Sequence, residues 1–112
     1  MKFAIPLRNG KLSNHFGHAK TFALIAANPI TQQIASREDL VPPPHDTGLL
    51  PQWLVEHGVT CIITGGMGPH SRGECAEKGM RIVLGAPTED PENVVRAFLN
   101  GSLVTGANAC RH

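Results

Sequence analysis

The sequence predicts one α/β domain in three layers, built on a mixed five-stranded sheet. Two observations lead to this prediction. The second half of the chain alternates apolar runs with helix signals, whereas the first half contains strand-like segments without a helix signal between them. Alternating strands and helices are typical of a parallel core covered by helices on both faces. With 112 residues, of which 41% are apolar, the chain is expected to form one domain over residues 1–112.

The first half is expected to supply one strand and a hairpin. Residues 2–7 form an apolar run, which ends at a turn containing Gly10. Two further strand-like segments are separated by Asn28-Pro29, which predicts the break between them. The polar residues of the later segment place it at an edge or with one exposed face. The expected strands are residues 2–7, 21–27 and 30–40.

Proline and glycine mark the boundaries in the second half. Three prolines at 42–44 predict a stiff linker, and Gly58 and Gly79 are typical residues after a helix C-terminus. Residues 102–112 show no periodicity and are expected to form a flexible tail. Asp46 or Thr47 is the expected cap of the first helix, and Thr88 or Asp90 that of the last. The expected helices are residues 49–57, 70–78 and 91–99, and the expected strands are 59–64 and 80–84.

Composition excludes several classes of function. The formal charge is +1, basic residues are scattered, and the aromatic residues are four Phe and one Trp, which argues against nucleic-acid binding. No apolar run approaches the length of a membrane span, and the one near the N-terminus is too short for a signal peptide. We therefore expect a cytoplasmic protein. Three widely spaced cysteines do not form a disulfide framework.

The loop after the first strand carries the most informative residues. His15 and His18 can supply imidazole ligands or bind an anion, with Gly17 between them and Lys20 after them. Their spacing on a loop does not fix their relative direction, and a single surface histidine is usually only solvated. The loop follows the first strand, and a glycine-rich loop follows the strand at 59–64. We expect the two loops to meet at the same edge of the sheet.

The glycine-rich loop is Gly65-Gly66-Met67-Gly68. Its three glycines let a ligand approach the backbone, and the helix that follows directs free N–H groups toward the same space. Met67 offers a soft thioether. The competing interpretation is a tight strand-to-helix turn. At the other end of the chain, Cys110 and His112 could close over a metal, or could belong to a disordered terminus.

Four motifs together resemble the dinitrogenase iron–molybdenum cofactor biosynthesis family. They are Asn14-His15-Phe16-Gly17-His18-Ala19, Gly48-Leu49-Leu50-Pro51, Gly65-Gly66-Met67-Gly68 and Asn108-Ala109-Cys110-Arg111-His112. The resemblance implies a ribonuclease-H-like α/β/α fold. Its members include carriers of nitrogenase cofactor precursors and orange proteins, which hold a molybdenum–copper sulfide cluster. By motif, His15 matches the cluster-contacting histidine, and the 65–68 loop matches the facing wall.

The leading hypothesis is binding and carriage of a metal–sulfur cluster or thiometallate, either a Mo/Fe or a Mo/Cu sulfide. Cluster donor and acceptor proteins would be the partners, and the chain would be a monomer or weak dimer. No acid–base pair or nucleophile motif is found, so we do not expect an enzyme. The predicted cofactor-binding residues are His15, Gly17, His18, Gly65, Gly66, Met67 and Gly68, and the predicted metal ligands are His15, Cys110 and His112.

Two other functions remain open on the sequence. One is an interaction or regulatory module without a cluster, which would bind a partner through the hairpin or the proline linker. The other is an enzyme acting on a phosphorylated small molecule at the same anion site, for which no general base can be named.

Overall fold

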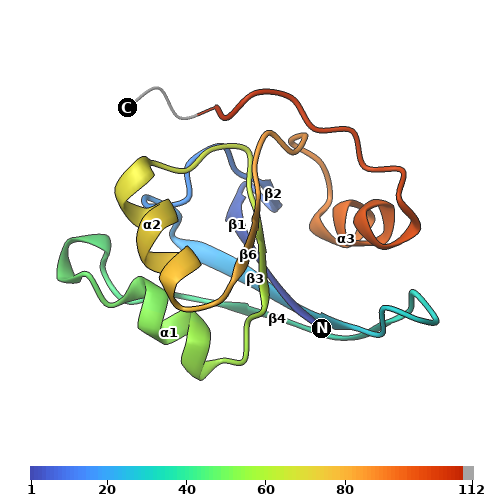
Figure 1. Cartoon of the computed structure of the whole chain (residues 1–112), viewed down its shortest axis with the longest axis horizontal. Coiled ribbons are helices and arrows are strands. Elements are labelled where there is room, and N and C mark those ends of the chain that lie inside the picture. Colours follow the sequence, from blue (N-terminus) through green and yellow to red (C-terminus); the bar gives the residue numbers. More distant parts are fainter. Residues whose placement is uncertain (110–112) are drawn as a thin grey trace.

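A mixed β-sheet separates α1 and α2 on one face from α3 on the other (Figure 1). The computed structural model describes residues 1–109, except for the side chain of His45. The strands are β1 Lys2–Arg8, β2 Lys11–Leu12, β3 Thr21–Ala27, β4 Ile34–Leu40, β5 Cys61–Ile63 and β6 Arg81–Val83. The helices are α1 Leu50–Glu56, α2 Pro69–Glu77 and α3 Pro91–Asn100, and a 3-10 turn covers His45–Thr47.

The sheet order is β4-β3-β1-β5-β6, with β2 paired to the end of β1. The neighbours β1, β5 and β6 are parallel, whereas β3 and β4 run antiparallel to the strands beside them. This arrangement confirms the predicted three-layer α/β class. It also brings the loops that follow β1 and β5 to the same edge of the sheet, as expected for parallel neighbours.

Each face of the sheet has its own apolar core. Along β1, Phe3 and Ile5 pack with Val94 and Val95 of α3, whereas Ala4 between them packs with the α1 and α2 side. This alternation follows from the two-residue repeat of a strand. Buried groups on the second face include Leu54, Ile62 and Cys75. No helix among residues 1–109 is long and apolar enough to cross a bilayer.

The structure corrects the predicted strand count, because β2 adds a sixth strand. Asn9 and Gly10 have φ values of 54° and 77°, the left-handed pair that a two-residue hairpin turn requires. Leu7 therefore pairs with Leu12, and Arg8 pairs with Lys11. From the sequence, this segment was expected to be a turn leading into a loop, although Asn-Gly between such residues is a strong hairpin signal.

Two other boundaries also differ. The strand expected from residue 30 begins at Ile34, because the Asn28 side chain accepts the N–H groups of Ile30 and Thr31 and holds a turn. Helix α1 has Leu49 at its N-cap with no side-chain cap, so the expected caps Asp46 and Thr47 are wrong; both belong to the separate 3-10 turn.

At α3, Asp90 caps the helix as predicted, by accepting the Glu92 N–H at 2.9 Å. Residues 102–109 contain neither helix nor strand. They are nevertheless hydrogen-bonded to two loops of the domain. The flexibility expected of residues 102–112 stays a prediction.

Candidate functional site

The histidine loop, residues 13–20, joins β2 to β3 and is anchored by its buried members. Ser13 donates its N–H to the Pro6 carbonyl at 2.8 Å, and its hydroxyl oxygen accepts the His15 N–H at 3.0 Å. Phe16 is buried against Phe22 in an edge-to-face contact. Since these two residues face inward, His15 and His18 remain exposed on the loop surface.

The glycine loop, residues 65–68, is fastened to the histidine loop by backbone hydrogen bonds. Gly65 donates to the Ser13 carbonyl at 3.1 Å, and Phe16 donates to the Gly66 carbonyl at 3.2 Å. The buried Thr64 hydroxyl donates a hydrogen bond to the same Ser13 carbonyl, at 3.2 Å. The predicted meeting of the two loops is therefore confirmed.

Two adjoining cavities open beside the histidine loop. The larger, here the histidine cavity, measures about 460 Å³ and is lined by residues that include Arg8, His15, His18 and Lys20. The smaller, here the hairpin cavity, measures about 290 Å³, and Lys11 is among its lining residues. Four residues line both cavities: Arg8, Asn9, Ser13 and His15.

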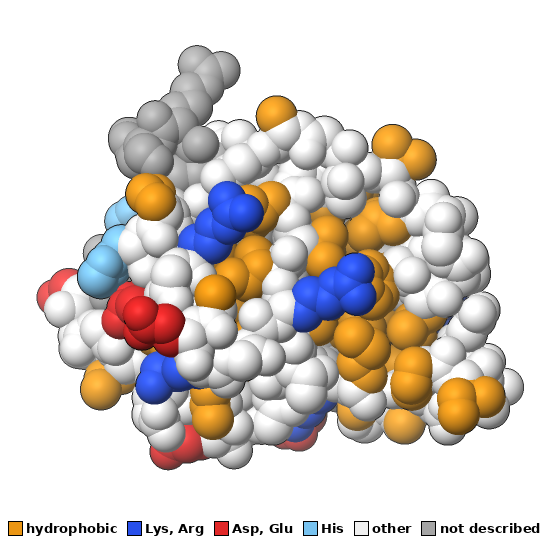
Figure 2. Space-filling view, viewed as in Figure 1, with side chains coloured by type: hydrophobic (Ala, Val, Ile, Leu, Met, Phe, Trp, Pro, Cys, Tyr) orange, Lys and Arg blue, Asp and Glu red, His pale blue; other side chains and the backbone are white. Residues whose placement is uncertain are grey.

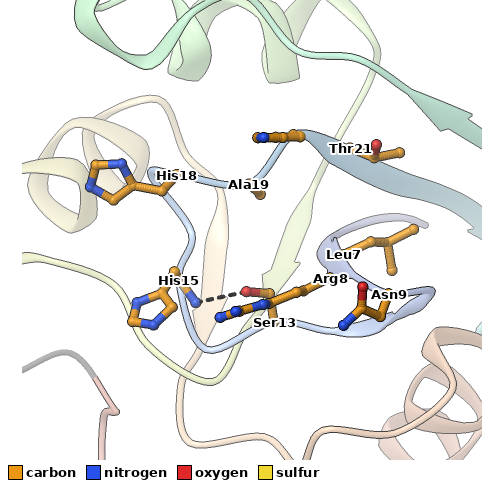
Figure 3. Close-up of a pocket in the computed structure, with 9 residues that line it drawn as sticks. Leu7, Arg8, Asn9, Ser13, His15, His18, Ala19 and Thr21 are labelled. Atoms are coloured by element: carbon orange, nitrogen blue, oxygen red, sulfur yellow. Dashed lines mark hydrogen bonds between the residues drawn. The ribbon is translucent and has the colours of Figure 1, made fainter.

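The two cavities form a cationic surface. In Figure 3, the imidazoles of His15 and His18 project to the same side of their loop, and the Arg8 side chain extends toward His15. Arg8, Lys11 and Lys20 contribute positive charge, and none of the described lining residues carries a carboxylate. A concave surface with charge of one sign concentrates ligands of the opposite sign. The site is therefore suited to an anion, and an imidazole can act there as a ligand or a hydrogen-bond donor.

The family model for the dinitrogenase iron-molybdenum cofactor matches residues 1–101. The chain belongs to this family. No curated protein matches it. The family assignment confirms the resemblance inferred from the four sequence motifs.

Solved structures confirm the fold of this family member. The protein PH0822 is 24% identical, with a TM-score of 0.85, over 97% of this chain and 98% of that one. The structure of mj0327 from Methanocaldococcus jannaschii is 22% identical in sequence, with a TM-score of 0.75 over 96% of both chains. The apo form of the orange protein from Desulfovibrio gigas is 19% identical, with a TM-score of 0.72. The match covers 96% of this chain and 93% of that one. At these identities, the likeness is one of fold.

The family member's glycine loop lies outside the lining of the two cavities, and its role as a facing wall, which the resemblance implied, stays a prediction. None of residues 65–68 lines either cavity, and Gly65 and Gly66 are buried. Three of its N–H groups are bonded within the protein: Gly65 to the Ser13 carbonyl, Gly66 to the Thr64 hydroxyl, and Met67 to the Asn108 side chain. The loop supports the histidine loop from behind.

Met67 and Gly17 are also placed differently from the prediction. The Met67 side chain is 1% exposed and packs with Phe16 and Cys75, so its sulfur belongs to the core and is not offered as a soft ligand. A thioether is apolar enough to fill a core position, and Met67 fills one in this protein. Gly17 lines a separate cavity of about 280 Å³, together with His70 and Glu74.

The cysteines of the described chain are not thiolate donors. Cys61 and Cys75 are buried, and burial raises the pKa of each thiol to about 11. Cys110 and His112, two of the predicted metal ligands, lie outside the described residues. Within residues 1–109, no group of three or more His, Cys, Asp or Glu side chains is arranged to hold a metal ion.

Sequence reasoning missed two residues of the cationic lining. Arg8 and Lys11 were expected to be turn residues, whereas Lys20 was already placed beside the two histidines at the predicted anion site. The available signal was Asn9-Gly10, because a two-residue hairpin sets its flanking residues side by side. Arg8 and Lys11 are indeed direct partners across that hairpin.

Proposed function

We propose that this protein binds and carries an anionic metal–sulfur species, a thiometallate or a small cluster, in the histidine cavity. The observation that carries the proposal is the lining of the two adjoining cavities: Arg8, Lys11 and Lys20 together with two imidazoles, and no carboxylate. Membership of the dinitrogenase iron-molybdenum cofactor family supports this class of cargo. The orange protein, with its similar fold, supports the molybdenum–copper sulfide version expected from the resemblance.

The described residues fit such a cargo by charge and by donor chemistry. Charge-assisted hydrogen bonds from Arg8 and Lys20 would neutralise an anion, and a guanidinium presents several donors in a fixed plane. His15 would act as the ligand to a soft or intermediate metal, because imidazole nitrogen suits copper and iron. Its backbone N–H is held by Ser13, which fixes where its side chain leaves the loop.

Carriage without catalysis is the role we assign. His15 and His18 are exposed on the loop, so cargo could enter and leave without opening the core. Exchange would take place with a protein that assembles the cluster and another that receives it. The proposal includes no bond-making step by this chain.

An anaerobic titration tests the proposal. The purified protein is titrated with tetrathiomolybdate, alone and with Cu(I), while visible absorption and gel filtration follow the bound chromophore. We expect saturable binding that His15→Ala weakens at least tenfold. His70→Ala is the matched control, because His70 is exposed on α2 and lines neither the histidine cavity nor the hairpin cavity. Binding that is absent, or equal in the two variants, would refute the proposal.

A second candidate is an interaction module, favoured by two exposed apolar side chains. Ile30 is 89% exposed at the β3–β4 turn, and Val41 is 77% exposed where the proline linker begins. They flank β4 at its two ends. If this function holds, the double substitution of both by serine should abolish capture of a stoichiometric partner, whereas His15→Ala should leave it intact. The opposite pattern would exclude it.

A further inference from the structure

The hairpin cavity lies between three segments of the chain. The β1–β2 hairpin contributes Arg8 and Lys11, the histidine loop forms a second wall, and Thr88 lines the cavity from the loop between β6 and α3. Leu12 on β2 donates its N–H to the Glu89 carbonyl at 2.9 Å, so this last loop is fastened to the hairpin. A ligand held in the cavity is therefore within reach of side chains from three directions.

Arg8 and Lys11 place two positive charges directly opposite each other. They are paired residues of the hairpin, so their side chains lie on the same face. At every other paired position of the sheet within residues 1–109, at most one of the two partners is charged. On the face of the molecule seen in Figure 2, by contrast, the Lys and Arg side chains lie apart from one another.

This pair of cations has no counter-ion in the part of the chain that the structure describes. The ion pairs there involve Arg37, His70 and Arg96, and neither Arg8 nor Lys11 takes part in one. Like charges directly opposite each other destabilise a strand pair. An anion bound between the two side chains would remove this repulsion.

Uncharged donors surround the two cations. Ser13 lines the cavity and is 5% exposed; its Oγ accepts the His15 N–H, and its hydroxyl proton has no acceptor among residues 1–109. Asn14 and Thr88 also line the cavity, and neither side chain is hydrogen-bonded to a described residue. Because buried polar groups are normally paired, the Ser13 hydroxyl in particular points to an oxygen acceptor in the cavity.

The lining selects an oxyanion and not a metal ion. No carboxylate or thiolate lines the hairpin cavity within the described residues, and its one imidazole, that of His15, also lines the histidine cavity. Guanidinium, ammonium and hydroxyl donors are suited to phosphate oxygens. A water molecule occupies about 30 Å³ in the liquid, so a cavity of about 290 Å³ has room for a four-oxygen anion and ordered water.

We propose that the hairpin cavity is a separate binding site for a phosphate group, either inorganic phosphate or the phosphoryl group of a larger molecule. Lys11 and Thr88 serve this site alone, because they line the hairpin cavity and not the histidine cavity. Arg8 lines both cavities and is shared between the two anions. The site does not depend on the cargo proposed above, since its ligand contains no metal.

A phosphate titration at constant ionic strength tests the site. Sodium phosphate replaces sodium chloride while NMR follows the backbone amides, and we expect saturable shifts at the hairpin and at Thr88. Lys11→Gln should raise the phosphate Kd about tenfold, because one charge-assisted hydrogen bond is lost. Thr88→Val, which retains the side-chain shape, should give a smaller increase.

Lys78→Gln is the matched control for Lys11→Gln. The Lys78 amine is bonded to Gln52, away from the cavity, so the phosphate Kd should not change. Shifts that do not saturate, or equal Kd values for Lys11→Gln and Lys78→Gln, would overturn the proposal.

Lys20→Gln separates the two cavities, because Lys20 lines only the histidine cavity of the two. It should weaken tetrathiomolybdate binding but change the phosphate Kd by less than about twofold, since exposed charges away from the ligand are screened. A larger loss of phosphate binding in Lys20→Gln than in Lys11→Gln would place the phosphate in the histidine cavity and refute a separate site. If the protein binds no tetrathiomolybdate, the proposed function fails alone, and the phosphate titration still decides this one.

Thermal unfolding tests the repulsion between the two cations. Without phosphate, Lys11→Gln should not lower the Tm, because it removes a like-charge pair. Phosphate should raise the Tm of the unmodified protein, as any ligand of the folded state does, and should raise that of the variant less. A lower Tm of Lys11→Gln without phosphate would assign Lys11 a structural role and overturn the proposal.

Methyl phosphate distinguishes the two sources of the phosphate group. Binding of methyl phosphate as tightly as inorganic phosphate would support the phosphoryl group of a larger molecule, whereas its rejection would support the free ion. Binding of neither would overturn the proposal.

Discussion

Arg37 on β4 donates a hydrogen bond to Glu92 on α3 at 3.0 Å, and so joins the outer strand of the sheet to the helix that covers one face. The same guanidinium binds both carboxylate oxygens of Asp39, at 2.9 and 3.1 Å. These carboxylates raise the pKa of Arg37 above its already high value, so it stays charged at every practical pH. Strand β4 is polar and mostly exposed, so it packs little apolar surface. The Arg37–Glu92 ion pair adds a connection to α3 that apolar packing of β4 does not supply.

Arg37→Ala should therefore lower the free energy of unfolding by about 1 kcal/mol, as expected of a partly exposed ion-pair network. Urea denaturation at low and high salt measures the effect. Arg96→Ala provides the comparison, because Arg96 contacts Glu92 at 3.5 Å from within α3 and connects no second element. An equal loss in the two variants would contradict the bridging role.

Alkaline pH should destabilise the fold through its buried thiols. Burial raises the pKa of Cys61 and of Cys75 from 9.0 to about 11 in the folded protein. The folded state therefore keeps protons that the unfolded chain releases, and stability falls as pH rises from about 9 to 11. At 1.36 kcal/mol per pKa unit, each thiol accounts for roughly 2 to 3 kcal/mol. Urea denaturation at several pH values should show the fall.

The Cys75→Ala variant isolates the contribution of one thiol. Its stability at neutral pH should be lower, because the core loses volume, but its decline between pH 9 and 11 should be shallower than in the unmodified protein. A decline of the same steepness would mean that the buried Cys75 thiol is not the source.

Gly65→Ala should separate the two loops. The added methyl group would overlap the Asn14 side chain and come within 3.0 Å of its Cα, so either Asn14 or the glycine loop must move. We expect a loss of about 1 to 3 kcal/mol in unfolding free energy, typical of overpacking, and weaker tetrathiomolybdate binding. Gly17→Ala is the control, since nothing lies within 4 Å of its Cβ position. If thermal unfolding shifts by the same amount in both, the close approach has no special importance.

Arg8→Gln should weaken tetrathiomolybdate binding about tenfold, the loss expected when one charge-assisted hydrogen bond to an anion is removed. Binding to the unmodified protein should also fall as salt is raised, because exposed charges are screened. Lys78→Gln is a control on α2's C-terminal side, where the amine contacts Gln52 away from both cavities. Salt-independent binding, or equal effects of the two substitutions, would argue against a cationic site.

The sheet and helices could be predicted because their signals are local. Apolar runs, prolines in first turns and glycines after helix ends identified each α-helix and, except for β2, each strand among residues 1–109. Boundaries shifted where a side chain competed for backbone groups, as Asn28 does at the β3–β4 turn. Such competition depends on geometry that a one-dimensional pattern does not contain.

The candidate site was only partly predictable. His15 was predicted as a site residue because its loop follows a strand, at the edge of the sheet where open α/β folds bind ligands. The glycine loop was expected to offer its backbone to a ligand, and nothing local in the sequence shows that Asn108, 41 residues later, bonds both backbone groups of Met67. Nor does the sequence show that the Met67 side chain turns into the core. Both facts depend on contacts between segments far apart in the chain.

The position of Ala109 has a practical consequence for producing the protein. Ala109 donates its N–H to Gly65, and Gly65 donates its own to Ser13 of the histidine loop, so an affinity tag on the C-terminal side of Ala109 is tethered near that loop. A polyhistidine tag there would add competing imidazoles beside the cavity. Met1, by contrast, is held by Ala27 at the start of β1, and Arg8 lies at the other end of that strand. A cleavable tag before Met1 therefore leaves any metal titration to report on the protein's own donors.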